Sequence, residues 1–166
     1  MYIIHNVYIP FELSRCGGAL ISADHVLTAA RCVEGQSPSS VEVLLGQHSV
    51  SFKWMNSVTR LGVSTITLDP LYNISNGQND LAILTLAQQA TFSYKVAPIC
   101  LPWSCGGHSD DYIGQVAIAT GWGLTYYNST DAERPDVLQE VEVNVTSNEE
   151  CQGAFKNYTT QGQIGE

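Results

Sequence analysis

Short apolar or alternating segments recur along the chain, and residues that favour turns separate them. These segments lie at residues 2–9, 17–22, 26–29, 41–45, 58–68, 81–86, 115–120 and 138–145. Gly, Pro and Asn are frequent between them, and almost nothing follows the helical period of about 3.6 residues. Short strands without intervening helices favour an antiparallel barrel or sandwich, so we expect an all-β fold.

Two of the segments carry further detail. In residues 138–145, Val141, Val143 and Val145 alternate with polar residues, which predicts a half-buried strand with one wet face. In residues 58–68 the apolar positions change parity midway, which predicts a β-bulge or bend.

One helix is predicted, near residues 147–156. Ser147 fits the N-cap position and Glu150 follows it by three residues, the spacing of a capping box. We expect this short helix to end at about Phe155 or Lys156.

Composition and charge exclude several classes of function. The chain has 166 residues, of which 44% are hydrophobic, and its formal net charge is −9. This length allows one ordinary domain with a sizeable core. No basic cluster occurs, so binding to nucleic acid or to an anionic membrane surface is disfavoured. No apolar run reaches the roughly 18 residues of a membrane span.

Cysteines and glycosylation sequons together favour an extracellular, disulfide-bonded protein. Four N-x-[ST] sequons begin at Asn73, Asn128, Asn144 and Asn157, more than chance predicts from the composition. The five cysteines form no CxxC pair, and no histidine completes a zinc site, so we expect no metal and no cofactor. The export signal is expected upstream, because residues 1–10 make a poor signal peptide.

Four segments, in order, resemble the chymotrypsin/trypsin family of serine endopeptidases. They read Cys-Gly-Gly-Ala-Leu-Ile-Ser at 16–22, Val-Leu-Thr-Ala-Ala-Arg-Cys at 26–32, Asn-Asp-Leu-Ala-Ile-Leu at 79–84, and Gly-Trp-Gly at 121–123. The Pro-Ile-Cys-Leu-Pro connector at 98–102 fits the same family, and the resemblance covers nearly the whole chain. It implies a trypsin-like double β-barrel. Residues 1–101 would form a nearly complete first barrel, 102–114 a connector, and 115–166 a truncated second barrel.

The resemblance also implies a Ser-His-Asp triad, and this sequence departs from it. Asp80 matches the carboxylate that orients the histidine, whereas Arg31 stands where the catalytic histidine is expected. An arginine remains protonated and cannot accept the proton of a serine. The Gly-Asp-Ser-Gly-Gly segment that carries the nucleophile is absent from these residues. We therefore expect a direct ion pair between Arg31 and Asp80 and no catalysis.

The remaining cysteines and histidines have less specific roles. The resemblance implies a disulfide between Cys16 and Cys32. A partner for Cys151 is expected beyond Glu166, and Cys100 is expected to pair with a distant cysteine, a pro-region or Cys105. His25 is interpreted as an exposed turn residue, and no rescue of catalysis is expected from the other histidines, which are His5, His48 and His108. The loop at 47–56 holds no acidic residue, so no calcium site is expected.

Three interpretations of function follow. The first is a secreted serine protease homologue that has lost catalysis and acts by binding. The second is a fragment or misread sequence of an active serine endopeptidase, and the third is a truncated product without a stable fold. The expected partners are protein or peptide substrates, proteases, or inhibitors of a proteolytic pathway. Arg31 favours the first interpretation, because truncation does not explain that residue.

Overall fold

The computed structural model describes residues 6–11, 14–49, 58–102, 112–124 and 134–154, with side chains described from Cys16 onward except that of Gln152. Its elements, in order, are β1 (Asn6–Phe11), β2 (Ser14–Leu20), β3 (His25–Thr28), α1 (Ala30–Val33), η1 (Pro38–Ser40), β4 (Glu42–Leu45), β5 (Thr59–Leu68), β6 (Ala82–Leu86), β7 (Val116–Gly121), β8 (Gln139–Asn144) and α2 (Asn148–Ala154). Strands dominate, and the expected all-β class is confirmed.

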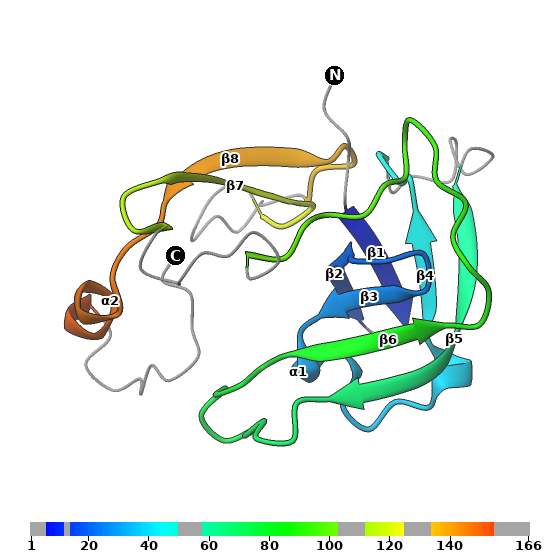
Figure 1. Cartoon of the computed structure of the whole chain (residues 1–166), viewed down its shortest axis with the longest axis horizontal. Helices are drawn as coiled ribbons and strands as arrows, with labels where there is room; N and C mark the ends of the chain where they lie inside the picture. Colours follow the sequence, from blue (N-terminus) through cyan, green and yellow to red (C-terminus); the bar gives the residue numbers. More distant parts are fainter. Residues whose placement is uncertain (1–5, 12–13, 50–57, 103–111, 125–133, 155–166) are drawn as a thin grey trace.

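The first six strands close into an antiparallel barrel (Figure 1). Around the barrel the order is β1-β2-β3-β6-β5-β4, and β4 pairs with β1 to close it. The closing contact is short, with Val7 opposite Leu45 and Tyr8 opposite Leu44. Closure leaves the six described strands of this barrel without an open sheet edge.

The core of the barrel is clearest in β6, where buried and more exposed residues alternate. In β6, Ala82, Leu84 and Leu86 are buried while Ile83 is exposed. Leu84 lies opposite Val26 of β3, and both are fully buried. A period of two places one face of each strand inside the barrel, so the sequence pattern itself selects the core.

The predicted irregularity in β5 is confirmed. The register between β5 and β6 shifts between Val63 and Thr65, where the apolar positions change parity. The Oγ of Ser64 donates hydrogen bonds to the carbonyl oxygens of Thr85 and Leu86 at 3.1 and 3.3 Å. The bulge thus lets Leu61 and Val63 point inward before the strand bends.

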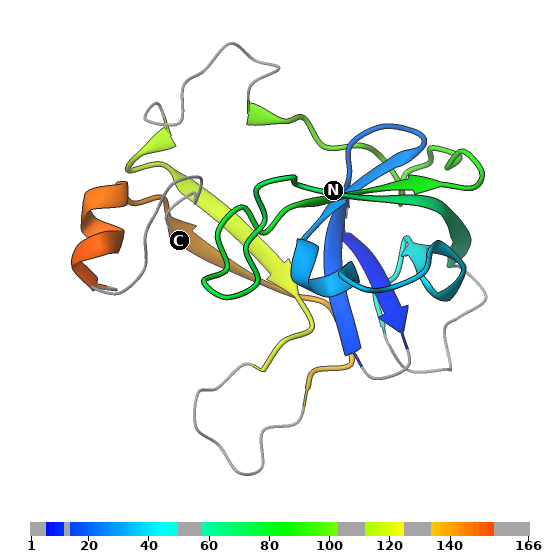
Figure 2. The ribbon, with the colours of Figure 1, turned by 90° about the horizontal axis from the view of Figure 1, so that it is seen from below.

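A second, smaller sheet consists of β7 and β8, which pair antiparallel from Val116 opposite Asn144 to Gly121 opposite Gln139 (Figure 2). The prediction that the valines of β8 are half-buried is wrong for Val141, whose side chain is 57% exposed. Two strands provide no second layer, so among the described residues nothing covers this position. The result agrees with a trypsin-like fold whose second barrel is truncated.

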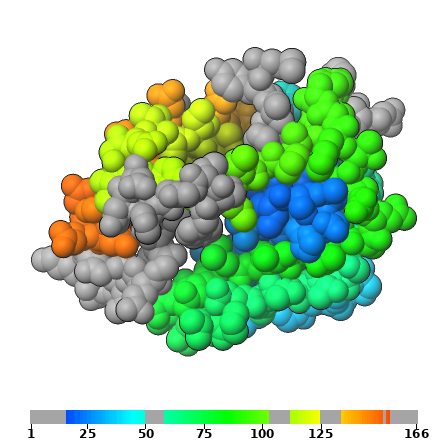
Figure 3. Space-filling view, in the orientation of Figure 1, coloured from blue at the N-terminus to red at the C-terminus, as the bar shows by residue number. Residues whose placement is uncertain are grey.

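The two sheets meet at the residues that follow β4, and they lie side by side in the space-filling view (Figure 3). The carbonyl oxygen of His48 accepts hydrogen bonds from the backbone N–H of Leu138 at 2.8 Å and from Nε1 of Trp122 at 3.2 Å. Ser49 donates from Oγ to the carboxylate of Asp136 at 2.6 Å. Trp122 of the Gly-Trp-Gly motif therefore helps to join the barrel to the second sheet.

The sequence predicted helix α2 but not the single turn α1. The capping box is confirmed: the backbone N–H of Glu150 donates to Ser147 Oγ at 3.2 Å, and that of Ser147 donates to the Glu150 carboxylate at 3.3 Å. Helix α2 is described to Ala154, and its predicted end at Phe155 or Lys156 lies outside the described residues. The single turn α1 was not predicted, because the sequence pattern there reads as the end of a strand.

The first strand extends past its predicted end. A strand at residues 2–9 was expected, and β1 is described from Asn6 to Phe11 and includes Pro10, whereas residues 2–5 lie outside the described residues. Pro10 lies beyond the two residues that pair with β4, so the N–H that it lacks is not needed for closure.

The barrel core is expected to carry most of the stability of this half. Leu84→Ala should lower the free energy of unfolding by about 2–5 kcal/mol, because it removes a fully buried side chain and leaves a cavity. The matched control Leu71→Ala, at a side chain 72% exposed, should change it by no more than about 0.5 kcal/mol. Urea unfolding followed by fluorescence measures both, and equal losses would contradict this location of the core.

Candidate functional site

The segment Thr28 to Val33 positions Arg31 at the surface. Strand β3 ends at Thr28, and α1 begins at Ala30 after Ala29 in an extended conformation. Ala30, Cys32 and Val33 of this turn are buried, so the remaining residue, Arg31, faces outward with a side chain 75% exposed.

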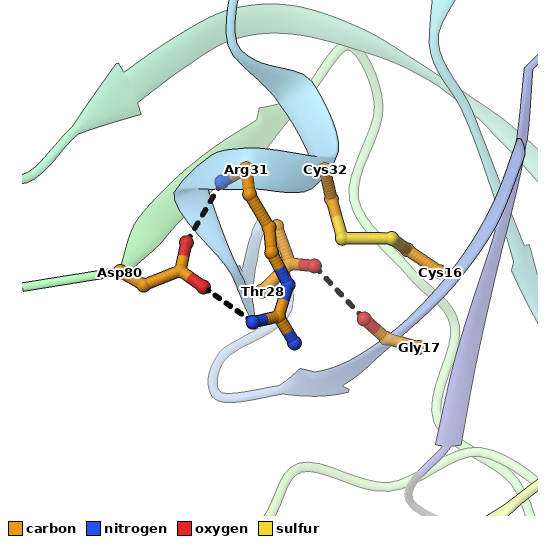
Figure 4. Close-up of a disulfide and its surroundings, with 6 residues drawn as sticks. All are labelled: Cys16, Gly17, Thr28, Arg31, Cys32 and Asp80. Carbon is orange, nitrogen blue, oxygen red and sulfur yellow. Dashed lines mark hydrogen bonds and ion pairs between the residues drawn. A yellow bond between two sulfur atoms is a disulfide. The ribbon is translucent and has the colours of Figure 1, made fainter. Parts of the chain in front are cut away.

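Two bonds attach this turn to β2. The disulfide between Cys16 and Cys32 is present, with the two Cα atoms 6.2 Å apart (Figure 4). The hydroxyl of Thr28 donates to the carbonyl oxygen of Gly17 at 2.8 Å. The backbone that carries Arg31 is therefore attached to β2 on both sides of residue 31, at Thr28 and at Cys32.

Asp80 reaches the same place from the connection between β5 and β6. Thr28 lies opposite Ala82 in the β3–β6 pair, so the chain after β3 and the chain before β6 are at one end of the barrel. Asn79 has a positive φ of 53°, and its carbonyl oxygen accepts a hydrogen bond from the N–H of Leu81 at 2.7 Å. This tight turn directs the Asp80 side chain toward α1.

Arg31 and Asp80 make two contacts (Figure 4). Nη1 of Arg31 lies 3.1 Å from Oδ2 of Asp80, and the backbone N–H of Arg31 donates to Oδ1 at 2.8 Å. The Asp80 side chain is only 15% exposed. The ion pair expected from the sequence is thus present, and both carboxylate oxygens are engaged by one residue.

Tyr72 lies next to this pair and packs against the barrel core. Burial raises the pKa of the Tyr72 hydroxyl, and the negative charges of Glu34 and Asp80 raise that pKa further. The phenol therefore stays protonated at neutral pH. An arginine side chain such as that of Arg31 stays protonated, and the phenol of Tyr72 stays neutral. Among Arg31, Tyr72 and Asp80, only the paired carboxylate of Asp80 is therefore able to accept a proton near pH 7.

A hydrogen-bond network that the sequence interpretation missed surrounds His25. Ser22 Oγ donates to Asp24 Oδ1 at 2.7 Å, and Nδ1 of His25 lies 2.9 Å from Ser22 Oγ and 2.7 Å from Asp24 Oδ1. His25 was expected to be an exposed turn residue; it is the first residue of β3, its side chain is 41% exposed, and its Nδ1 has two partners. The Ser-x-Asp-His sequence in a turn could have indicated it, since short polar side chains bond locally.

This network is separate from the Arg31–Asp80 pair. His25 begins β3 and Thr28 ends it, so the two sites are at opposite ends of a strand about 10 Å long. The structure therefore does not bring His25 to Asp80.

The other predicted site residues are scattered. Asn73 and Asn144 are exposed, on the β5–β6 connection and on β8. Cys100 is an exposed free thiol and Cys151 a half-buried one. The predicted residues that lie outside the described part of the chain are His5, Cys105, His108, Asn128 and Asn157.

Within the described ranges, no three His, Cys, Asp or Glu side chains gather in a way that could hold a metal ion. No described helix is long and apolar enough to span a bilayer.

Comparison with protein families matches residues 5–166 to the family described as "Trypsin". The chain belongs to the trypsin family.

Curated relatives carry serine protease names. The chain is 35% identical over 147 residues to "Serine protease filzig" of Drosophila melanogaster, covering 87% of this chain and 8% of that protein. It is 33% identical over 153 residues to "Vitamin K-dependent protein C" of Mus musculus, covering 90% and 32%. It is 30% identical over 141 residues to "Venom serine protease" of Polistes dominula, covering 82% and 48%. The chain thus spans less than half the length of each.

Solved structures agree on the fold. "Structure of GrC" superposes with a TM-score of 0.80 at 28% identity, covering 98% of this chain and 70% of that one. "Neuropsin, a serine protease expressed in the limbic system of mouse brain" gives 0.79 at 27% identity, covering 98% and 68%.

The Arg31–Asp80 contact should stabilise the fold measurably. Asp80→Asn removes a little-exposed charge that accepts two bonds, so we expect the free energy of unfolding to fall by about 1 kcal/mol. The control Glu42→Gln breaks the Arg60–Glu42 pair, which is about 40% exposed on both sides, and should cost less. Urea unfolding compares the two variants, and an unchanged midpoint for Asp80→Asn would refute the contribution of the pair.

The network around His25 predicts a pH dependence. The hydrogen bond from Ser22, with smaller contributions from His25, lowers the pKa of Asp24 below its ordinary 3.8. The stability that this carboxylate adds is therefore present above pH 3.8 and is lost as the pH falls through the lower folded-state pKa. An NMR titration of the Asp24 carboxyl carbon should show this, and Ser22→Ala should move the midpoint upward. A midpoint unaffected by Ser22→Ala would show that the hydrogen bond from Ser22 is not the main reason for the lowered pKa of Asp24.

Proposed function

We propose that this chain is a serine protease homologue without peptidase activity, which acts by binding other proteins. One observation carries the proposal: Arg31, at the position where the family resemblance implies the catalytic histidine, bonds to the Asp80 carboxylate through both its side chain and its backbone.

Serine peptidase chemistry requires a group that takes the proton of the attacking hydroxyl. A histidine held by an aspartate does this near neutral pH, because its ring nitrogen is unprotonated. A guanidinium stays protonated at any working pH and has no lone pair available to take a proton, so it cannot replace the ring. Loss of the base alone reduces turnover by about 10⁶-fold in a related mechanism.

This defect is independent of what flanks the 166 residues, since Arg31 and Asp80 both lie within them. The fold tolerates the exchange, because the carboxylate finds a cationic partner and a backbone N–H in place of an imidazole. The protein can therefore keep a surface that binds other proteins after it has lost catalytic activity.

Secretion is part of the proposal. The Cys16–Cys32 disulfide is the kind of bond that persists in oxidising compartments. The sequons at Asn73 and Asn144 are exposed, as glycosylation in the secretory pathway requires. The partners would be proteases, their inhibitors or protein substrates of a proteolytic pathway.

A second candidate is an active serine endopeptidase whose residue 31 is a histidine in the natural protein. The intact Asp80 and the serine protease names of the relatives favour this alternative. Arg31 in the natural protein would exclude it.

The test uses the full-length protein isolated from its source. Peptide-mapping mass spectrometry first reads residue 31. A fluorophosphonate probe, which labels activated serines, and chromogenic peptide substrates then measure chemistry. We expect Arg31, no probe labelling and no turnover, because no base activates a serine.

An Arg31→His variant of the same protein is the matched control, with Arg31→His/Asp80→Asn as its negative. Gain of labelling in the first and not in the second would show that only the base is missing. Turnover by the protein with Arg31 in place would refute the proposal.

A further inference from the structure

The connection between β5 and β6 exposes two large apolar side chains that the barrel does not use. Leu71 is 72% exposed and Ile74 is 69% exposed, and Asn73 lies between them in the sequence. In Figures 1 and 2 this connection lies beside α1, and in Figure 3 it stands at the surface.

Asn73 is held in one orientation by its own turn. Its Oδ1 accepts the N–H of Ser75 at 2.9 Å, its backbone N–H donates to the carbonyl oxygen of Gln78 at 2.9 Å, and its carbonyl oxygen accepts the N–H of Gly77 at 2.8 Å. These bonds leave the Nδ2 atom of Asn73 with no acceptor in the described part of the chain. An exposed Asn with a free Nδ2 in the sequence Asn-Ile-Ser is an acceptor for an N-linked glycan.

Other polar groups of the connection bond to one another. Nδ2 of Asn76 donates to Oε1 of Gln78 at 2.9 Å, and the N–H of Leu71 donates to Oδ1 of Asp69 at 2.8 Å. A protein partner would find few unsatisfied polar groups here beside the two apolar side chains. A glycan attached between those side chains would cover them with the apolar faces of its sugar rings.

The connection is also close to the Arg31–Asp80 pair. Nδ2 of Asn79, the residue before Asp80, donates to the carbonyl oxygen of Leu71 at 3.0 Å. Tyr72, which adjoins Asn73, lies near enough to Asp80 and Arg31 for both charges to act on its hydroxyl. A bulky group on Asn73 would therefore be attached to the same β5–β6 connection that carries Asp80.

We propose that Asn73 carries an N-linked glycan that covers Leu71 and Ile74 and screens the Arg31–Asp80 pair from large partners on this side. The inference rests on the secretion included in the proposed function. In the reaction, Nδ2 of Asn73 forms a bond to C1 of an oligosaccharide carried on a polyisoprenyl diphosphate. The C1–O bond to the diphosphate breaks, the lipid diphosphate leaves, and Nδ2 loses one proton.

The experiment uses the protein secreted by cultured eukaryotic cells. Peptide-N-glycosidase converts each occupied Asn to Asp, and mass spectrometry then reads occupancy at every sequon. Hydroxyl-radical footprinting measures the accessibility of Leu71 and Ile74, and phenylglyoxal modification measures that of Arg31. Tyr94, which is 70% exposed on the segment after β6, is the internal reference.

Three comparisons isolate the glycan. Asn73→Gln and Ser75→Ala each abolish the sequon, and Ser75→Ala keeps the Asn73 side chain and the N–H to which it bonds. Enzymatic removal of the glycan from the folded protein needs no engineered variant and leaves Asp at residue 73. Asn144→Gln removes a sequon on the second sheet and is the matched control.

We expect occupancy at Asn73. Loss of that glycan by each route should increase oxidation of Leu71 and Ile74 and modification of Arg31 severalfold, with Tyr94 unchanged. Asn144→Gln should leave all of these values as in the natural protein.

Occupied sequons elsewhere with Asn73 unmodified would overturn this inference and leave secretion intact. Occupancy of Asn73 without protection of Leu71, Ile74 or Arg31 would overturn the covering role. Failure of the chain to be secreted, with every sequon unmodified, would overturn the secretion on which it rests.

Discussion

Pairing of β3 with β6 in the first barrel is the constraint on which the candidate site depends. Because β3 and β6 pair antiparallel with Thr28 opposite Ala82, the chain must leave β3 and enter β6 at one end of the barrel. Arg31 and Asp80 are 49 residues apart in the sequence, and this pairing alone brings their backbones together. The disulfide to Cys16 and the turn at Asn79 then orient the side chains. The order of the strands thus brings the two backbones together, and the local residues then set the directions of the side chains.

That order of dependence explains why the barrel does not rely on the side chain of residue 31. The Arg31 side chain is 75% exposed, so its charge is largely solvated and its pair with Asp80 contributes little to stability compared with the buried core. The backbone N–H of Arg31 supplies one of the two contacts with Asp80, and a backbone N–H does not depend on the identity of the side chain at residue 31.

The sequence predicted those features that depend on near neighbours. Alternation in β6, the parity change in β5 and the Ser147–Glu150 capping box each involve a few consecutive residues, and each is present in the structure. The barrel order came from the family resemblance, since pairing of β3 with β6 leaves no periodic signal. The network of Ser22, Asp24 and His25 was missed because its partners depend on rotamers. Val141 was misjudged because burial depends on a second layer, which a strand pattern cannot supply.

The charges around Arg31 limit what the proposed binding can use. In a chain of net charge −9, an exposed arginine could attract an acidic partner. Here Asp80 neutralises the guanidinium at 3.1 Å, and the negative charge of Glu34 acts on the same tyrosine as both of them. The local charge of these three residues is therefore negative, and long-range steering of an acidic ligand to Arg31 is disfavoured. The proposed binding therefore does not use the positive charge of Arg31 to attract an acidic partner.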